Sequence, residues 1–199
     1  MTKIIGLTGG IGSGKTTVAK MIEQLGYAVY NSDTRAKNLV NESSALKQEI
    51  IQLLGEKAYD KNGLYDRRYV AEQVFSNKTL LQQLNAIIHP AVNQDFHQWV
   101  ERENFDLVFK ETALLFELKL NLQCYKSILV TADESIRIKR VMDRDHKTYR
   151  EVEKIISNQM PERRKIKLAD YIIENNTHLE HLQSQTEKTI RVIEKELSY

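Results

Sequence analysis

The pattern of hydrophobic and polar positions changes along the chain between short apolar runs, which predict strands, and apolar residues at helical spacing, which predict helices. Short apolar runs bounded by glycine or polar residues predict five strands, at residues 3–8, 27–31, 105–111, 125–132 and 169–175. After the first run, Val18, Met21, Ile22 and Leu25 recur at helical spacing, and Gly26 is a typical helix stop. The order of strand, glycine-rich loop, helix and strand predicts a βαβ unit and therefore a parallel sheet.

The segment between the second and third strands has a different pattern, because almost all of it is helical. Two apolar stripes at helical spacing begin at Leu46 and Leu80, and the turn sequence "DKNGLYD" at 60–66 separates them. Pro90 predicts a helix start or a helix break within this segment. We therefore expect a helical lobe inserted into a single domain, with further helices at 133–167 and an amphipathic helix from His178.

Composition narrows the class of protein. The chain has 199 residues, 41% of them hydrophobic and 28% charged, which is typical of one soluble globular domain. Its net charge of +2 does not favour a nucleic-acid partner, and no apolar run approaches a membrane span or a signal peptide. A single cysteine, Cys124, excludes an intrachain disulfide. We expect a cytoplasmic protein with no membrane association, and the sequence indicates no protein partner.

The glycine-rich loop carries the most specific chemistry. Residues Gly9 to Thr16, "GGIGSGKT", match the pattern G-x-x-x-x-G-K-[ST] between a predicted strand and a predicted helix. Glycines allow successive backbone N–H groups to surround a polyphosphate, and the helix directs its positive end to the same place. Lys15 is expected to reach the β and γ phosphates, and the Thr16 hydroxyl to ligate Mg²⁺. The loop predicts a nucleoside triphosphate site.

This loop occurs in small-molecule kinases, GTPase switches and ATP-driven motors. A GTPase needs N-K-x-D, but "NKTL" at 77–80 lacks the Asp, and "DKNG" at 60–63 does not follow a convincing strand. Motor ATPases usually have a longer chain and a strand that ends in adjacent acids, whereas the third strand ends in a single acid, Glu111. The short chain, the helical lobe and a later arginine cluster favour a kinase.

Asp33, Arg140 and Arg144 are candidates for phosphoryl transfer, and each has an alternative structural role. Asp33 follows the second strand, where a carboxylate could accept a proton from an attacking hydroxyl or could cap the next helix. Arg140 and Arg144 lie four residues apart and could clamp phosphates, or could form a solvated face with neighbouring acids. Position alone does not separate these roles.

Other polar positions favour structural roles. His89 alone is more often structural than a ligand, and no third ligand accompanies His178 and His181. The segment "ERRKIK" at 162–167 is expected to be solvated. Spacing does not decide whether Glu117 belongs to a helix or accepts a hydrogen bond from substrate.

Several segments along the chain form one set of motifs: "GLTGGIGSGKTTVA" at 6–19, "NSD" at 31–33, Arg67, "LNAIIHP" at 84–90, "ETALLFE" at 111–117, "RVMDRD" at 140–145 and "ADYIIENN" at 169–176. Taken together, these segments resemble motifs of the dephospho-CoA kinase family. The loop motif alone is generic, whereas the His-Pro, Leu-Leu-Phe-Glu and Arg-Asp motifs together are specific. The resemblance covers nearly the whole chain.

The chain also departs from the family pattern at several positions. Asn31 and Ser32 replace the first two residues of an Asp-Ala-Asp motif, which leaves the role of base to Asp33. Glu111 replaces Asp, which keeps the charge but lengthens the side chain near the Mg²⁺ shell, and Ala113 replaces Pro. No departure removes a group that the chemistry requires.

The resemblance implies an α/β P-loop kinase with a five-stranded parallel sheet. A core at 1–33, 105–133 and 168–199 would carry a helical acceptor lobe at about 34–104 and a lid at about 134–167. The implied reaction is ATP-dependent phosphorylation of the 3′-hydroxyl of dephospho-CoA, which gives coenzyme A and ADP. Another small acceptor, such as a nucleoside monophosphate or a sugar acid, is the alternative, followed by a nucleotide-gated switch.

The resemblance also implies a role for each site residue. Asp33 would be the base, and Lys15 and Arg140 would stabilise the transferred group. Thr16 and Glu111 would hold Mg²⁺, and the acceptor would contact Asp33, Arg67, His89 and Glu117. The residues expected to bind ATP are Gly9, Gly10, Ile11, Gly12, Ser13, Gly14, Lys15, Thr16, Thr17, Arg140, Arg144 and Asn175.

Overall fold

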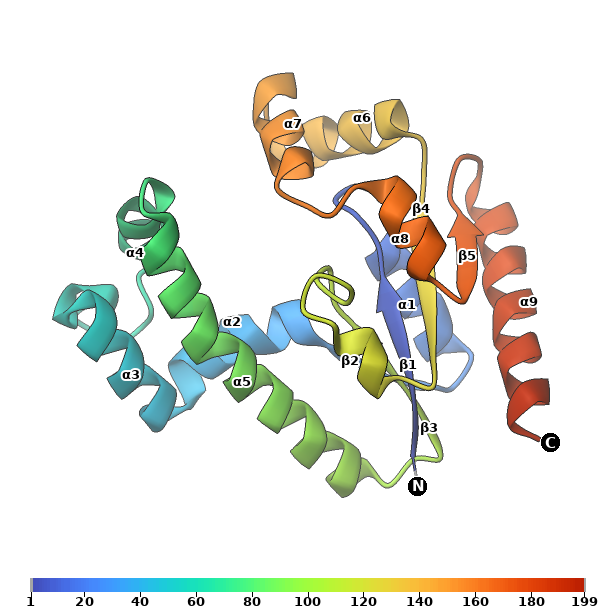
Figure 1. The fold of residues 1–199 in the computed structure, drawn as a ribbon, viewed down its shortest axis with the longest axis horizontal. Helices are drawn as coiled ribbons and strands as arrows, with labels where there is room; N and C mark the ends of the chain where they lie inside the picture. Colours follow the sequence, from blue (N-terminus) through green and yellow to red (C-terminus); the bar gives the residue numbers. More distant parts are fainter. Residues whose placement is uncertain (1, 199) are drawn as a thin grey trace. The chain divides into compact units, whose positions relative to one another are not determined.

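A parallel β-sheet organises the fold. The computed structural model describes residues 2–198, and Figure 1 shows their helices and strands. The strands are β1 (Lys3–Thr8), β2 (Ala28–Asn31), β3 (Leu107–Glu111), β4 (Lys126–Thr131) and β5 (Tyr171–Glu174). They pair in the order β2-β3-β1-β4-β5, and every pair is parallel. The predicted α/β class with a five-stranded parallel sheet is confirmed.

The strand register brings the carboxyl ends of the strands to one edge of the sheet. Glu111 at the end of β3 lies opposite Leu7 of β1 and also opposite Asn31 at the end of β2. β1 is the central strand, and the chain crosses from it to β2 on one side before it later forms β4 on the other. Ligands of open α/β sheets bind at such a point, where the strand order reverses.

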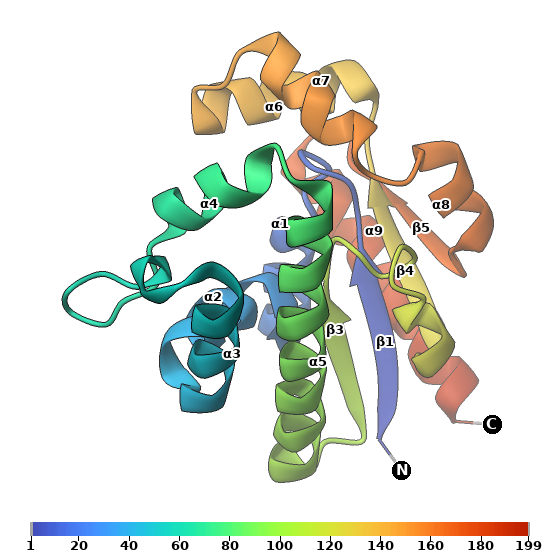
Figure 2. The same ribbon diagram turned by 60° about the vertical axis from the view of Figure 1, so that its left-hand side comes forward.

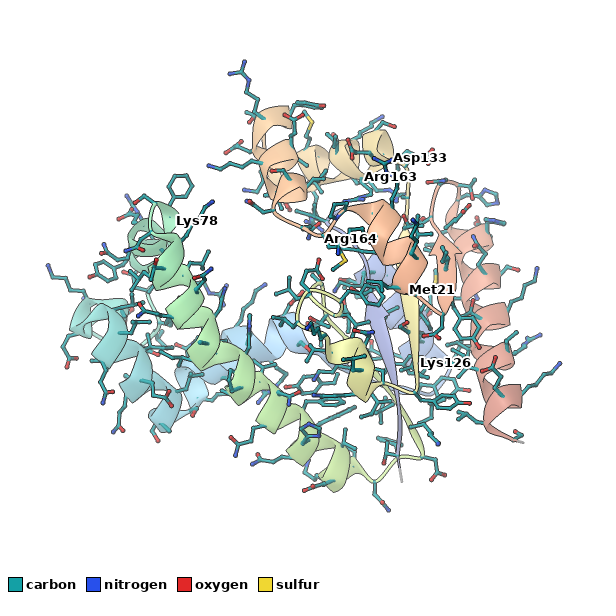
Figure 3. The ribbon with its side chains drawn as sticks, viewed as in Figure 1. Met21, Lys78, Lys126, Asp133, Arg163 and Arg164 are labelled. Atoms are coloured by element: carbon teal, nitrogen blue, oxygen red, sulfur yellow. The ribbon has the colours of Figure 1, made fainter. Side chains whose placement is uncertain are left out.

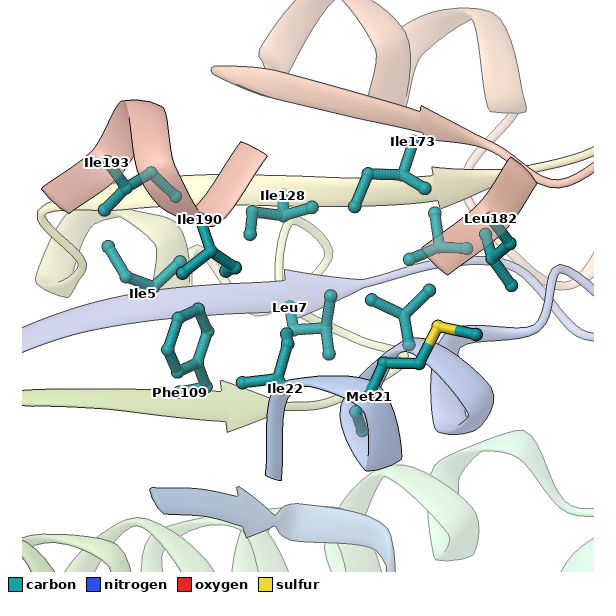
Figure 4. Close-up of a cluster of buried hydrophobic side chains, with 13 residues drawn as sticks. Ile5, Leu7, Met21, Ile22, Phe109, Ile128, Ile173, Leu182, Ile190 and Ile193 are labelled. Carbon is teal, nitrogen blue, oxygen red and sulfur yellow. The ribbon is translucent and has the colours of Figure 1, made fainter. Parts of the chain in front are cut away.

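Two helices cover one face of the sheet. These are α1 (Lys15–Gln24) and α9 (Leu179–Leu197), which contact each other. Ile5 and Leu7 of β1 are fully buried and belong to a cluster that includes residues of both helices (Figure 4). Because strand side chains alternate, Gly6 faces the other way, and a Cβ there would lie 2.7 Å from the side chain of Leu115. The sheet is therefore buried on both faces around β1.

The chain divides into two compact units. We call residues 2–31 with 105–198 the sheet unit, and residues 32–104 the helical unit. The helical unit contains α2 (Ser32–Glu42), α3 (Ser44–Leu54), the short 3₁₀ helix η1 (Glu56–Ala58), α4 (Arg67–Phe75) and α5 (Lys78–Glu103). Arg35 of α2 donates to both carboxylate oxygens of Asp95 of α5, over 3.0 and 2.8 Å. This forked ion pair fixes α2 against α5.

The expectation that Pro90 starts or breaks a helix is wrong. α5 runs through Pro90 as one helix of 26 residues. A proline removes one backbone hydrogen bond and crowds the preceding turn. Packing against α2, α3 and α4 keeps the helix continuous, since all three contact α5.

The remaining helices of the sheet unit follow β4 and β3. They are α6 (Glu134–Asp145), α7 (Tyr149–Ser157), α8 (Glu162–Leu168) and the 3₁₀ helix η2 (Leu120–Gln123). Figure 2 shows α6 and α7 side by side. Ile138, Val141 and Val152 form a small buried cluster between them. Within residues 2–198, no helix is both long and apolar enough to cross a bilayer.

Candidate active site

The loop after β1 is shaped by glycines at close approaches. Gly12 and Gly14 have φ of 79° and 93°, in the left-handed region that favours glycine. A Cβ on Gly12 would collide with the backbone of Arg137, and one on Gly14 with the side-chain amide of Asn175. The loop is therefore held against α6 and against the end of β5 by contacts that leave no space for a side chain.

The N-terminus of α1 is suited to an anion. Gly14 occupies the N-cap position without a side-chain hydrogen bond, and the first turn of α1 contains no acidic residue. The first N–H groups of a helix have no intrahelical acceptor, and the helix dipole adds positive potential at this end. A phosphate group can therefore take the place of the missing cap.

The Glu111 carboxylate contacts three polar side chains at the edge of the sheet where the strands end. Its carboxylate is only 1% exposed, and Oε1 accepts hydrogen bonds from Lys15 Nζ at 2.5 Å and Thr16 Oγ1 at 3.0 Å. Asn31 Nδ2 donates to the other oxygen, Oε2. The buried charge is thus neutralised by one cation and two neutral donors. Two of the departures from the family pattern, Asn31 and Glu111, are hydrogen-bonded to each other.

Arg140 and Asn175 meet beneath the loop. Asn175 is 8% exposed, and its Nδ2 donates to Ser13 O at 2.9 Å. Arg140 Nη2 donates to Asn175 Oδ1 at 3.3 Å, while its buried Nη1 has no hydrogen-bond partner among residues 2–198. A buried guanidinium nitrogen with unused donors is suited to an acceptor supplied by a ligand.

Arg144 is not brought to the same place. Its side chain is 65% exposed, and Nε and Nη2 donate to the two oxygens of Asp145 over 2.7 and 2.8 Å. These hydrogen bonds hold the pKa of the Asp145 carboxyl below its usual range. The structure thus places Arg144 in the acid-partnered arrangement that the sequence left as an alternative.

Glu117 lies beside the chain segment that joins α7 to α8. Its Oε1 accepts from Met160 N at 3.1 Å and lies 3.3 Å from Lys165 Nζ. The expectation that "ERRKIK" is solvated is wrong for Lys165, which is fully buried, because it is ion-paired with this carboxylate. Arg163 and Arg164 of the same helix are exposed, as expected (Figure 3).

The predicted acceptor residues of the helical unit lie on three different helices. Asp33 is exposed in the first turn of α2, which begins at Ser32 rather than after Asp33. Arg67 is the exposed first residue of α4, and His89 is half-buried in α5. Burial lowers the pKa of His89. The cavity of about 420 Å³ in this unit is lined by α2, α3 and α5, including Arg35 and Asp95, and by none of these three residues.

Two residues that no sequence motif indicates, Arg137 and Gln159, both contact the loop. Arg137 Nε donates to Ile11 O at 3.0 Å, and Ile11 N donates to Gln159 Oε1 at 3.1 Å. A signal for Arg137 was present, because it lies four residues before Val141 on the buried face of α6. Gln159 follows α7 in an irregular segment, where no periodicity marks it.

The oxygen atoms of Thr16 and Glu111 fit a magnesium ion that is held partly by the protein and partly by substrate phosphates. Among residues 2–198, no three His, Cys, Asp or Glu side chains form a group that could hold a metal. Mg²⁺ usually takes one or two carboxylates together with substrate phosphates and waters. Thr16 Oγ1 and Glu111 Oε1 are hard oxygen donors 3.0 Å apart beside the phosphate-binding loop, and they match this pattern.

A parallel sheet whose central strand leads through "GGIGSGKT" into a helix defines a P-loop nucleotide-binding protein. Comparison with known proteins narrows this class. The dephospho-CoA kinase family profile matches residues 3–181. Dephospho-CoA kinase of Fusobacterium nucleatum is 40% identical over 190 residues, which cover 96% of this chain and 98% of that protein. The Bacillus cereus enzyme is 32% identical over 194 residues, covering 96% and 97%. The chain belongs to the dephospho-CoA kinase family.

Solved structures agree with this placement. Dephospho-CoA kinase from Campylobacter jejuni has a TM-score of 0.72 and 26% identity, and the match covers 98% of each chain. A Thermus thermophilus protein has a TM-score of 0.86 and 34% identity, over 96% of this chain and 97% of that one. Shikimate kinase from Acinetobacter baumannii, at 15% identity and a TM-score of 0.59, shares the fold alone.

Proposed function

We propose that this chain transfers the γ-phosphoryl group of ATP to the 3′-hydroxyl of dephospho-CoA. The products are ADP and coenzyme A, so the reaction is the final step of coenzyme A biosynthesis. The observation that carries the proposal is the Lys15–Thr16–Glu111 arrangement at the N-terminus of α1, in a family member. The composition, with its single cysteine, supports a cytoplasmic location.

The phosphates of ATP occupy the loop from Gly9 to Thr17. Backbone N–H groups and the α1 dipole attract the β and γ phosphates, and Lys15 exchanges its contact with Glu111 for a contact with phosphate. Arg140 uses its unpartnered Nη1 to stabilise charge on the transferred group. Arg144 leaves Asp145 to assist, and Asn175 contributes to the nucleotide site.

Mg²⁺ fits beside Thr16 and Glu111, directly or through water. When bound, it neutralises the charge that develops on the β and γ phosphate oxygens. The Asn31 amide holds one oxygen of Glu111, so the carboxylate keeps its orientation when Lys15 turns to phosphate. These residues thus orient the phosphates before transfer.

Asp33 orients the acceptor hydroxyl and takes its proton. The hydroxyl oxygen forms a bond to the γ phosphorus as the bond between that phosphorus and the β–γ bridging oxygen breaks, with the electron pair leaving on ADP. Arg67, His89 and Glu117 are proposed for the acceptor side. Support for these three is the family resemblance, together with the buried, unpartnered Oε2 of Glu117.

The test is ADP release by the purified protein with Mg-ATP, measured with and without dephospho-CoA. Adenosine and a nucleoside monophosphate serve as control acceptors, and the coenzyme A product is identified by mass. In the presence of Mg-ATP, we expect turnover with dephospho-CoA but with neither control acceptor. Turnover only with a control acceptor would overturn the acceptor assignment and leave the phosphate site standing. Nucleotide binding without any acceptor-dependent turnover would overturn the reaction itself.

A further inference from the structure

The tip of the phosphate-binding loop is held through one peptide group on each side of Ile11. The carbonyl oxygen of Ile11 accepts from Arg137 Nε at 3.0 Å, and its amide donates to Gln159 Oε1 at 3.1 Å. Ile11 also packs its side chain against the cluster of Ile138, Val141 and Val152 between α6 and α7. The one apolar side chain of the loop is therefore partly buried against the two helices that follow β4.

Arg137 is a buried residue that joins the loop to α8. It is 3% exposed, and its guanidinium uses separate nitrogens for two acceptors: Nε for Ile11 O and Nη1 for Glu162 Oε2 at 3.0 Å. A Cβ on Gly10 would lie 2.5 Å from the third nitrogen, Nη2. The planar, forked group thus fills the space behind Gly10 and connects the loop to the start of α8.

A buried arginine costs desolvation free energy, which these contacts must offset. The ion pair with Glu162 supplies the charge partner, while the bond to Ile11 O places that charge at the backbone of the loop. A lysine has a single point-like ammonium and does not reproduce two separate, coplanar bonds. The Arg137 guanidinium therefore holds the loop backbone in place in addition to bringing a positive charge to it.

We propose that Arg137 is a positioning residue, which, together with Gln159, fixes the loop tip in the conformation that binds the β and γ phosphates. The inference rests on the proposed function for its nucleotide, but not on the identity of the acceptor. Loss of Arg137 would let the Ile11 peptide rotate, so the backbone N–H groups would no longer converge on the phosphates. The purine and ribose contacts would be unaffected.

The test compares ADP with adenosine as ligands of Arg137→Met, Arg137→Lys and Gln159→Met. Dissociation constants for ADP come from calorimetry and those for adenosine from ligand-observed NMR. We expect Arg137→Met to weaken ADP binding about tenfold or more and to leave adenosine within about twofold. Arg137→Lys should remain close to Arg137→Met, and Gln159→Met should show a smaller loss of the same kind. Lys139→Met is the matched control, since it removes an exposed positive charge two residues away on α6.

Two results would overturn the proposal: equal losses for ADP and adenosine, or full affinity for ADP in Arg137→Met or Arg137→Lys. If Arg137→Met does not fold, Gln159→Met decides, and an unchanged ratio of ADP to adenosine affinity contradicts the proposal. A selective ADP loss in a protein that fails to phosphorylate dephospho-CoA supports the role of Arg137 and rejects only the acceptor assignment.

Discussion

The sheet unit and the helical unit differ in how they hold their predicted site residues. In the sheet unit, Lys15 and Thr16 meet on one oxygen of Glu111, at 2.5 and 3.0 Å. In the helical unit, Asp33, Arg67 and His89 lie on α2, α4 and α5. The proposed phosphate site is thus built locally, from the loop backbone and adjacent strand ends. The proposed acceptor residues instead depend on how separate helices pack, which a short motif does not encode.

The largest effect is expected from Lys15→Ala in the sheet unit. It removes the cation that pairs with Glu111 and that the loop motif assigns to phosphate, so kcat/KM should fall by about a thousandfold or more. Steady-state ADP release measures this, with Lys20→Ala, an exposed lysine of the same helix, as the control. Activity within about tenfold of the unsubstituted protein would break the assignment of the loop.

Asp33→Asn tests whether the helical unit takes part in the chemistry at all. An asparagine keeps the shape but cannot accept the proton, so kcat should fall about a hundredfold while the KM for ATP changes less than about threefold. The matched control is Glu49→Gln, an exposed acid on α3. A kcat close to that of the unsubstituted protein would reject Asp33 as the base.

Asn31→Asp tests how far the sheet unit depends on the hydrogen bond between Asn31 and Glu111. It places a second carboxylate against the buried Glu111, and we expect the free energy of unfolding to fall by about 1–3 kcal/mol at neutral pH. The two carboxylates repel each other only while both are charged, so the deficit should shrink as the pH is lowered and one of them takes up a proton. Denaturant unfolding at several pH values measures this.

The double variant Asn31→Asp/Glu111→Gln is the control for that experiment. It restores one carboxylate and one amide with their positions exchanged, so most of the lost stability should return. A double variant as unstable as Asn31→Asp would show that charge repulsion is not the cause.

His89→Gln should give the smallest effect. Burial lowers the pKa of His89 in the folded protein, so the unfolded chain takes up the proton more readily. The free energy of unfolding should therefore fall as the pH drops from about 7.5 to about 5.5, and His89→Gln should show less of this fall. His97→Gln, an exposed histidine of the same helix, is the comparison. An unchanged pH dependence in His89→Gln would contradict the burial effect.

Features that depend on local sequence are predictable from it, whereas features that depend on distant contacts are not. Strands and the loop were predictable because apolar runs and glycine positions act locally, as at Lys3–Thr8 and Gly14. Pro90 was misread because packing against three helices decides whether α5 continues. Lys165 was misread because its partner, Glu117, lies 48 positions away in the sequence. Long-range pairing of charged side chains is invisible to a periodicity.

The position of the helical unit in the chain has a consequence for folding kinetics. β2 and β3 are hydrogen-bonded neighbours, yet roughly 75 residues separate Asn31 from Leu107. Their pairing must close a loop of that length, and the entropic cost is lower if α2 to α5 have already collapsed into a compact insert. The pairings of β1 with β3 and β4 span the same insert. Slowing the formation of these helices should therefore delay all three pairings, whereas β4 and β5, which both follow the insert, pair without waiting for it.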